Sequence, residues 1–129
     1  MIYILENASA IVVAALAGLA IGFVHHRATG SDQRAGLGLA ATTLIANAVI
    51  ATILAGALIL APVKAGAWIV AIGTAFIIWA GFVAPAVVVS LRYHGVATGK
   101  VARDAGYWLV VMVVEAAALH AIGLVPPTP

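Results

Sequence analysis

Residues 36–61 read GLGLAATTLIANAVIATILAGALILA and contain no charged side chain. A helix rises about 1.5 Å per residue, so a helix over this stretch would cross the roughly 30 Å hydrocarbon core of a bilayer. Similar apolar stretches lie at about 3–24, 66–90 and 105–124. The sequence therefore predicts an all-α integral membrane bundle of four transmembrane helices.

The composition agrees with a chain that lies almost entirely within a membrane. Charged residues make up 8% of it, whereas soluble proteins carry about 25%. We expect one transmembrane domain over residues 1–129 and no soluble catalytic module. There is no cysteine, and no nucleophile–base pair, phosphate loop or metal-ligand pattern is recognisable, so neither an enzyme nor a cofactor or metal is expected. The few basic residues make no extended patch for nucleic acid.

The basic residues also predict an orientation. Five of the six Lys and Arg residues lie at 25–35 and 91–104, and Lys64 lies in the short turn between the second and third apolar stretches. Cytoplasmic loops of membrane proteins collect positive charge. We therefore expect a multi-pass protein of the inner (plasma) membrane, with loops 25–35 and 91–104 in the cytoplasm and both termini outside.

The two basic loops resemble each other. Ala28-Thr29-Gly30 and Arg34 recur as Ala97-Thr98-Gly99 and Arg103. This pattern suggests two similar helical hairpins, related by an axis along the membrane normal. Chance matching of Ala, Gly and Arg is the alternative.

Small residues indicate how the helices pack. Ala10, Ala14, Gly18 and Gly22 follow one another at four-residue intervals and would form one smooth face of the first helix. Membrane helices associate at such faces because the backbones can approach closely. Packing within the bundle is one interpretation, and a homodimer or larger membrane complex is the other. In the third helix Pro85 predicts a kink.

Glu115 lies at the middle of the fourth apolar stretch, where insertion of an ionised acid costs about 2.5–3.5 kcal/mol. We therefore expect a neutral carboxyl group there. Asn47 lies at a similar depth in the second stretch, and its amide is the expected hydrogen-bond partner. The pair is either a structural clasp between helices or a site that binds a proton or ligand.

Glu6 and His120 are candidates for a second polar pair, closer to the outer surface. Both lie outward from the membrane centre at similar depth, so an ion pair that senses external protons is expected. His120 and Glu115 are five residues apart and do not share a helix face. A relay between them would need water or another helix.

Several short segments resemble a known family. They are Asn7, Gly22, the segment WAGF at 79–82 and the segment DAGYWLV at 104–110. Together they are similar to a bacterial family of small membrane proteins catalogued as domain of unknown function 1761. The resemblance implies four helices and no established activity. His25-His26 and Glu115 depart from the residues expected in that family.

Two functions follow from these expectations. The first is a structural or accessory membrane subunit, which needs no chemistry. The alternative is a small proton-linked transporter or channel, working as a homo-oligomer, with Glu115 as the coupling or ligand-binding group. Its candidate site residues are Glu115, Asn47, Glu6 and His120.

Overall fold

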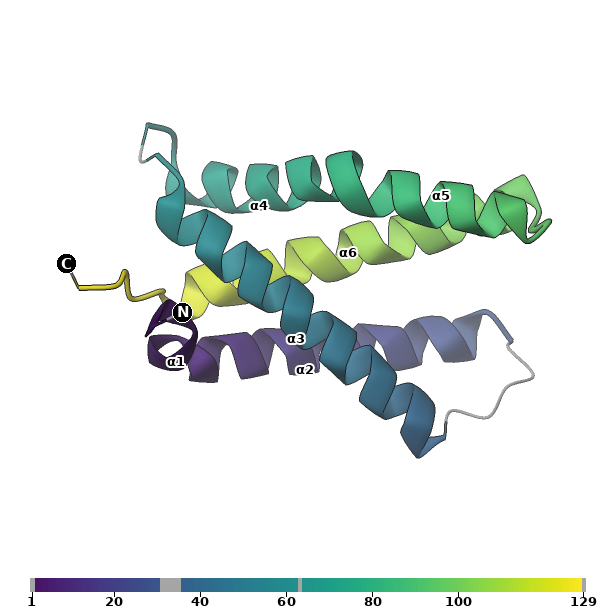
Figure 1. Cartoon of the computed structure of the whole chain (residues 1–129), viewed down its shortest axis with the longest axis horizontal. Helices are drawn as coiled ribbons and strands as arrows, with labels where there is room; N and C mark the ends of the chain where they lie inside the picture. Colours follow the sequence, from purple (N-terminus) through teal and green to yellow (C-terminus); the bar gives the residue numbers. More distant parts are fainter. Residues whose placement is uncertain (1, 31–35, 63, 129) are drawn as a thin grey trace.

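The computed structural model describes residues 2–30, 36–62 and 64–128, and every regular element in those ranges is helical (Figure 1). The elements are α1 (Ile2–Glu6), α2 (Ala8–Ala28), α3 (Leu37–Leu60), α4 (Ala67–Ile78), η1 (Trp79–Val83), α5 (Ala84–Tyr93) and α6 (Thr98–Ile122). Four spans are long and apolar enough to cross a membrane: Ala8–Ala28, Leu37–Leu60, Ala67–Tyr93 and Thr98–Ile122. The expectation of an all-α chain with four such helices is confirmed.

Two of the helices extend further than hydropathy predicted. α2 continues to Ala28 rather than ending near residue 24, and α6 begins at Thr98 rather than near residue 105. Hydropathy marks only the part of a helix that lies in hydrocarbon, whereas the helix itself can continue where charged side chains are solvated. The predicted loops at 25–35 and 91–104 were therefore too long. Residues 31–35, including Arg34, lie outside the described residues.

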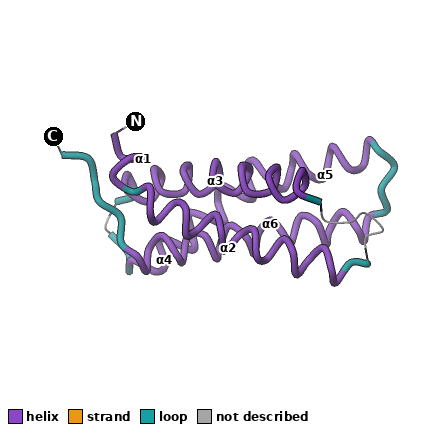
Figure 2. The backbone as a smooth tube through the Cα atoms, turned by 90° about the horizontal axis from the view of Figure 1, so that it is seen from below, coloured by secondary structure: helices purple, strands orange, loops and turns teal. Residues whose placement is uncertain are grey.

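α6 lies in the middle of the bundle. It packs against α2 and α3 and, separately, against α4 and α5, while α3 crosses α2 obliquely (Figures 1 and 2). The two chain ends and the α3–α4 connection lie at one end of the bundle, and the α5–α6 connection lies at the other (Figure 1). We call these the terminal end and the basic end, because the charged residues between 98 and 104 begin α6 at the latter.

The third span is interrupted by a π-helical turn, η1, directly before α5. The Ala84 N–H donates to the Trp79 carbonyl five residues back, as a π-turn requires. Pro85 follows, and its ring would clash with a carbonyl placed in a regular helix turn, so widening the preceding turn relieves that clash. The indole N–H of Trp79 donates to the Ala105 carbonyl at 2.8 Å and joins the interruption to α6. The break predicted at Pro85 thus begins six residues earlier.

Many small side chains, together with Leu54, Met112 and Leu119, make up the core, and most of it lies in the half of the bundle nearer the terminal end. Ala10 and Ala14 on α2, Ala51 and Ala55 on α3 and Ala116 on α6 are at most 2% exposed. Small residues allow membrane helices to approach closely without a hydrophobic driving force. The stripe predicted on the first helix is therefore used for packing within the chain from residue 10 to residue 18.

Asn7 joins the two ends of the chain. Its side-chain N–H groups donate to the Tyr3 carbonyl at 2.9 Å and the Val125 carbonyl at 2.8 Å, and the Val125 N–H donates to Asn7 Oδ1 at 2.7 Å. Asn7 is 2% exposed, so these bonds satisfy a buried amide. They hold the extended tail after α6 against the junction of α1 and α2.

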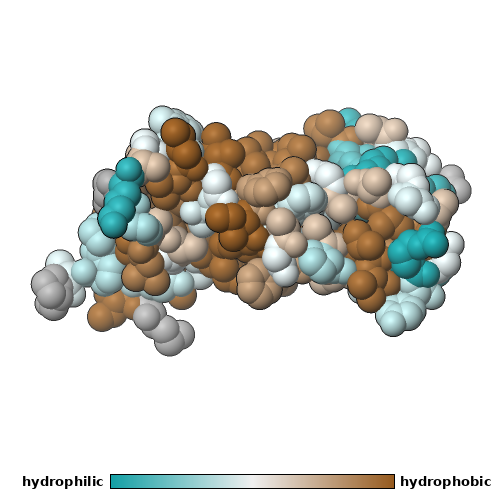
Figure 3. All heavy atoms as spheres, turned by 90° about the horizontal axis from the view of Figure 1, so that it is seen from above, coloured by the Kyte–Doolittle hydropathy of each residue, from teal (hydrophilic) through white to brown (hydrophobic). Residues whose placement is uncertain are grey.

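Apolar side chains cover most of the outer surface. On the third span Ile69, Ile77 and Phe82 are each at least 70% exposed. Figure 3 shows hydrophobic residues over the middle of one face and hydrophilic residues gathered toward its two ends. Such a surface is suited to contact with lipid tails between two headgroup layers.

Candidate functional site

The centre of the bundle contains Glu115 and Asn47, and neither side chain has any exposed surface. α6 positions Glu115, α3 positions Asn47, and both meet α2 at Gly18. A methyl group added to Gly18 would lie 2.7 Å from Glu115 Oε1 and 2.9 Å from Asn47 Cγ. The two residues that the sequence placed at similar depth therefore converge on one point of α2.

The polar atoms of this cluster have no hydrogen-bond partner within the described part of the chain. This holds for both carboxyl oxygens of Glu115 and for Oδ1 and Nδ2 of Asn47. The predicted hydrogen bond between the two side chains is therefore wrong, because packing brings them together without aligning donor and acceptor. Each unpaired buried polar group costs roughly 1–3 kcal/mol. A structural clasp made by a hydrogen bond between these two side chains is therefore not present.

Glu6 and His120 are not brought together. Glu6 ends the short helix α1 and is exposed. His120 packs edge-on against Trp68 of α4, with ring centroids 4.4 Å apart. The expected ion pair is wrong because the chain breaks at Asn7, so Glu6 does not continue the helix face of α2. Described ion pairs lie at the basic end instead.

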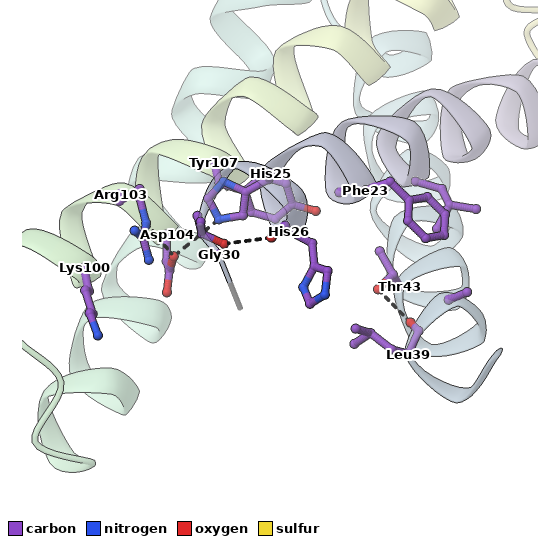
Figure 4. A pocket seen from close by; sticks show the side chains of 14 residues that line it. Phe23, His25, His26, Gly30, Leu39, Thr43, Lys100, Arg103, Asp104 and Tyr107 are labelled. Carbon is purple, nitrogen blue, oxygen red and sulfur yellow. Dashed lines mark hydrogen bonds and ion pairs between the residues drawn. The ribbon is translucent and has the colours of Figure 1, made fainter. Parts of the chain in front are cut away.

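A cavity of about 520 Å³ opens between α2, α3 and α6 at the basic end (Figure 4). α2 contributes His25 and His26, α3 contributes Thr43, and α6 contributes Asp104 and Tyr107. The cavity is polar at its charged mouth and is also lined by leucine and phenylalanine side chains of α2 and α3. It is therefore an open, partly polar recess between three of the four long apolar helices.

One wall of this cavity joins α2 to α6. The His25 ring stacks on Tyr107 with centroids 4.4 Å apart and an interplanar angle of 19°. His25 Nε2 lies 3.5 Å from Asp104 Oδ1, and Arg103 Nε lies 3.8 Å from the same oxygen. Because these side chains are partly exposed, we expect the ion pairs to contribute little to stability. The stacking contact holds the Tyr107 ring of α6 against α2.

Sequence reasoning missed Tyr107 as part of the site. Its hydroxyl oxygen lies 3.0 Å from the position of a methyl group added to Gly22, and Thr43 Cγ2 lies 3.4 Å from the same position. Gly22 is one helical turn, about 6 Å, from Gly18. The inner limit of the cavity is therefore about one turn from Glu115. The signal available in the sequence was that positions 107, 111 and 115 are four residues apart, which places Tyr107 and Glu115 on the same face of the helix.

No group of three or more His, Cys, Asp or Glu side chains that could hold a metal ion occurs among the described residues. Comparisons with protein-family models, with curated proteins and with solved structures found no match to this chain. The site is therefore interpreted from its geometry. A methyl group added to Gly18 would already overlap Glu115, so there is little free space around the carboxyl group. Gain or loss of a proton needs no additional volume, so this chemistry is compatible with the packing.

Proposed function

We propose that this protein is a small proton-linked transporter or channel of the plasma membrane, working as a homo-oligomer, with Glu115 as the proton-binding group. The observation that carries the proposal is the buried, unpartnered carboxyl group about one turn from a cavity. Ionisable residues inside membrane helices are rare and mark proton or substrate pathways. A buried ionisable residue of this kind therefore supports a functional role.

Asn47 supports this role by its chemistry. An amide can donate a hydrogen bond to an ionised carboxylate and can accept one from a protonated carboxylic acid. Asn47 could therefore partner Glu115 in either protonation state. We propose Asn47 as the residue that accompanies Glu115 through a cycle of proton uptake and release.

The proposal includes an orientation with the basic end in the cytoplasm, supported by the charged residues that begin α6. It also includes assignment to the bacterial family described above, which rests on the segments quoted for it. A homo-oligomer is proposed because the third span is mostly exposed and the terminal half of the core is apolar. A single chain therefore encloses no polar route across the membrane.

The test is proton flux into liposomes under an imposed pH gradient. Wild-type protein is compared with Glu115→Gln and with the matched control Glu6→Gln, which makes the same chemical change at an exposed position. We expect flux in wild type and in the control, and loss of flux in Glu115→Gln. Equal flux in all three proteins would refute the role of Glu115. Thermal unfolding of each variant in detergent establishes that the fold is retained.

A second candidate function is that of a structural or accessory membrane subunit. The observation that favours it is the third span, in which η1 and α5 have no buried residue. Gly73 and Gly81 on this span have no atom within 4 Å of an added methyl group, so another helix could approach closely there. Purification in mild detergent with an additional membrane subunit, together with absence of flux in wild type, would favour this role.

A further inference from the structure

We propose that, in the conformation of the bundle described above, Glu115 exchanges its proton through the cavity at the basic end and not with the terminal end, and that Tyr107 is the positioning residue at the inner limit of this path. The inference rests on the proposed function. It adds the direction of proton entry and the side chains along the route.

The path from the basic end is polar for most of its length. Figure 4 shows the side chains of His26, Lys100, Arg103 and Asp104 pointing toward the same side of the cavity. At its inner limit are the Tyr107 hydroxyl group and Thr43, whose Oγ1 donates to the Leu39 carbonyl at 2.8 Å. The remaining distance to the level of Gly18 is about 6 Å, or roughly two hydrogen-bond lengths.

The path from the terminal end is closed. Leu54, Met112 and Leu119 have no exposed surface, and small alanines fill the space around them. Within the described ranges the buried polar side chains are Asn7, Asn47 and Glu115. Asn7 is about 16 Å from Gly18 along α2 and is already hydrogen-bonded to the chain ends. A proton entering from this end would have to cross several apolar layers.

The titratable groups around Glu115 also lie mainly toward the basic end of the bundle. α3, α4 and η1 carry no ionisable residue. On the side of the basic end, α2 contributes His25 and His26, and α6 contributes Asp104 and Tyr107, which line the cavity. Toward the terminal end α6 carries only His120, which packs against an aromatic ring of α4. At the same end α1 carries Glu6, which is exposed, and Tyr3, whose hydroxyl group lies near Gly56 and Thr52 of α3. Most groups able to pass a proton toward Glu115 therefore lie on the cavity side.

The experiment measures which side sets the protonation of Glu115. The chain has no cysteine, so a Thr98→Cys background allows liposomes with the basic end outward to be captured through a membrane-impermeant thiol reagent. The pH is then set separately inside and outside the liposomes. Dicyclohexylcarbodiimide is added, because this reagent modifies protonated carboxyl groups in apolar surroundings. Mass spectrometry of the peptide containing Glu115 gives the rate, and Glu115→Gln identifies the modified residue.

We expect the rate to rise when the outer pH is lowered and to respond several-fold less when the inner pH is lowered. Ala40→Trp, which fills the cavity from α3, should slow the response to outer pH several-fold. The exposed control Ala41→Trp should not. A rate that follows the inner pH, follows both sides equally or stays at zero would overturn the inference, as would equal effects of the two tryptophans. The comparison of outer with inner pH uses the protein without either tryptophan, so it tests the inference even if a tryptophan variant does not fold.

These outcomes can be separated from failure of the proposed function. One-sided modification without proton flux would retain the access path and refute transport. Flux that depends on Glu115 together with modification from both sides would retain transport and refute the one-sided path.

Discussion

Replacing Gly18 with alanine tests the geometry of the buried cluster directly. The added methyl group would lie 2.7 Å from Glu115 Oε1 and between 2.9 and 3.0 Å from two atoms of Asn47. Both side chains would have to move, and both are fully buried. The matched control is Gly73→Ala on α4, where an added methyl group meets no atom within 4 Å.

The expected magnitude comes from two opposing terms. Alanine is favoured over glycine in a helix by about 1 kcal/mol, and both substitutions share this gain because both positions are inside helices. Overpacking a close-packed core costs typically 1–3 kcal/mol, and this term applies only at Gly18. The difference between the two variants should therefore be about 1–3 kcal/mol, with Gly18→Ala the less stable.

The assay is reversible denaturant or thermal unfolding in detergent micelles, followed by the helical circular dichroism signal. The double variant Gly18→Ala/Asn47→Ala provides a further check, because removing the Asn47 side chain opens space for the methyl group and should recover part of the loss. Equal stability of Gly18→Ala and Gly73→Ala would refute the convergence of Glu115 and Asn47 on α2.

Three further predictions concern other parts of the chain. Glu115→Met should leave the bundle as stable as wild type or more stable by up to about 3 kcal/mol, because it removes two unpartnered buried oxygens. Proton flux in liposomes should be lost in the same variant. A clear loss of stability would instead support a hydrogen-bonded clasp. Asn7→Ala should lower the unfolding free energy by roughly 1–3 kcal/mol and increase amide exchange at Val125, whose buried partner is removed, and unchanged exchange there would contradict the contact. In intact cells a cysteine that replaces Thr98 should react only with membrane-permeant reagents, whereas a cysteine that replaces Thr128 should also react with impermeant reagents. Impermeant labelling at position 98 and not at position 128 would reverse the proposed orientation.

Hydropathy alone was sufficient to predict four helices that are long and apolar enough to cross a membrane. The thickness of the hydrocarbon core sets how many consecutive apolar residues a span needs, and backbone hydrogen bonds that cannot be made to lipid require those residues to be helical. The same reasoning identified Glu115 and Asn47 as unusual, because a polar side chain in an apolar segment is visible in sequence. Helix ends were less accurate because helices continue beyond the hydrocarbon.

The tertiary structure decided which polar groups meet. Helices surrounded by lipid can rotate and tilt with little change in apolar contact, so sequence depth does not determine neighbours. The break at Asn7 separated Glu6 from the α2 face, and the π-turn at Trp79 changed the register of the third span. The crossing of α3 over α2 placed Glu115 and Asn47 against Gly18 and left a cavity at the basic end. The sequence thus determined the spans and the presence of a buried acid, whereas side-chain packing determined its surroundings.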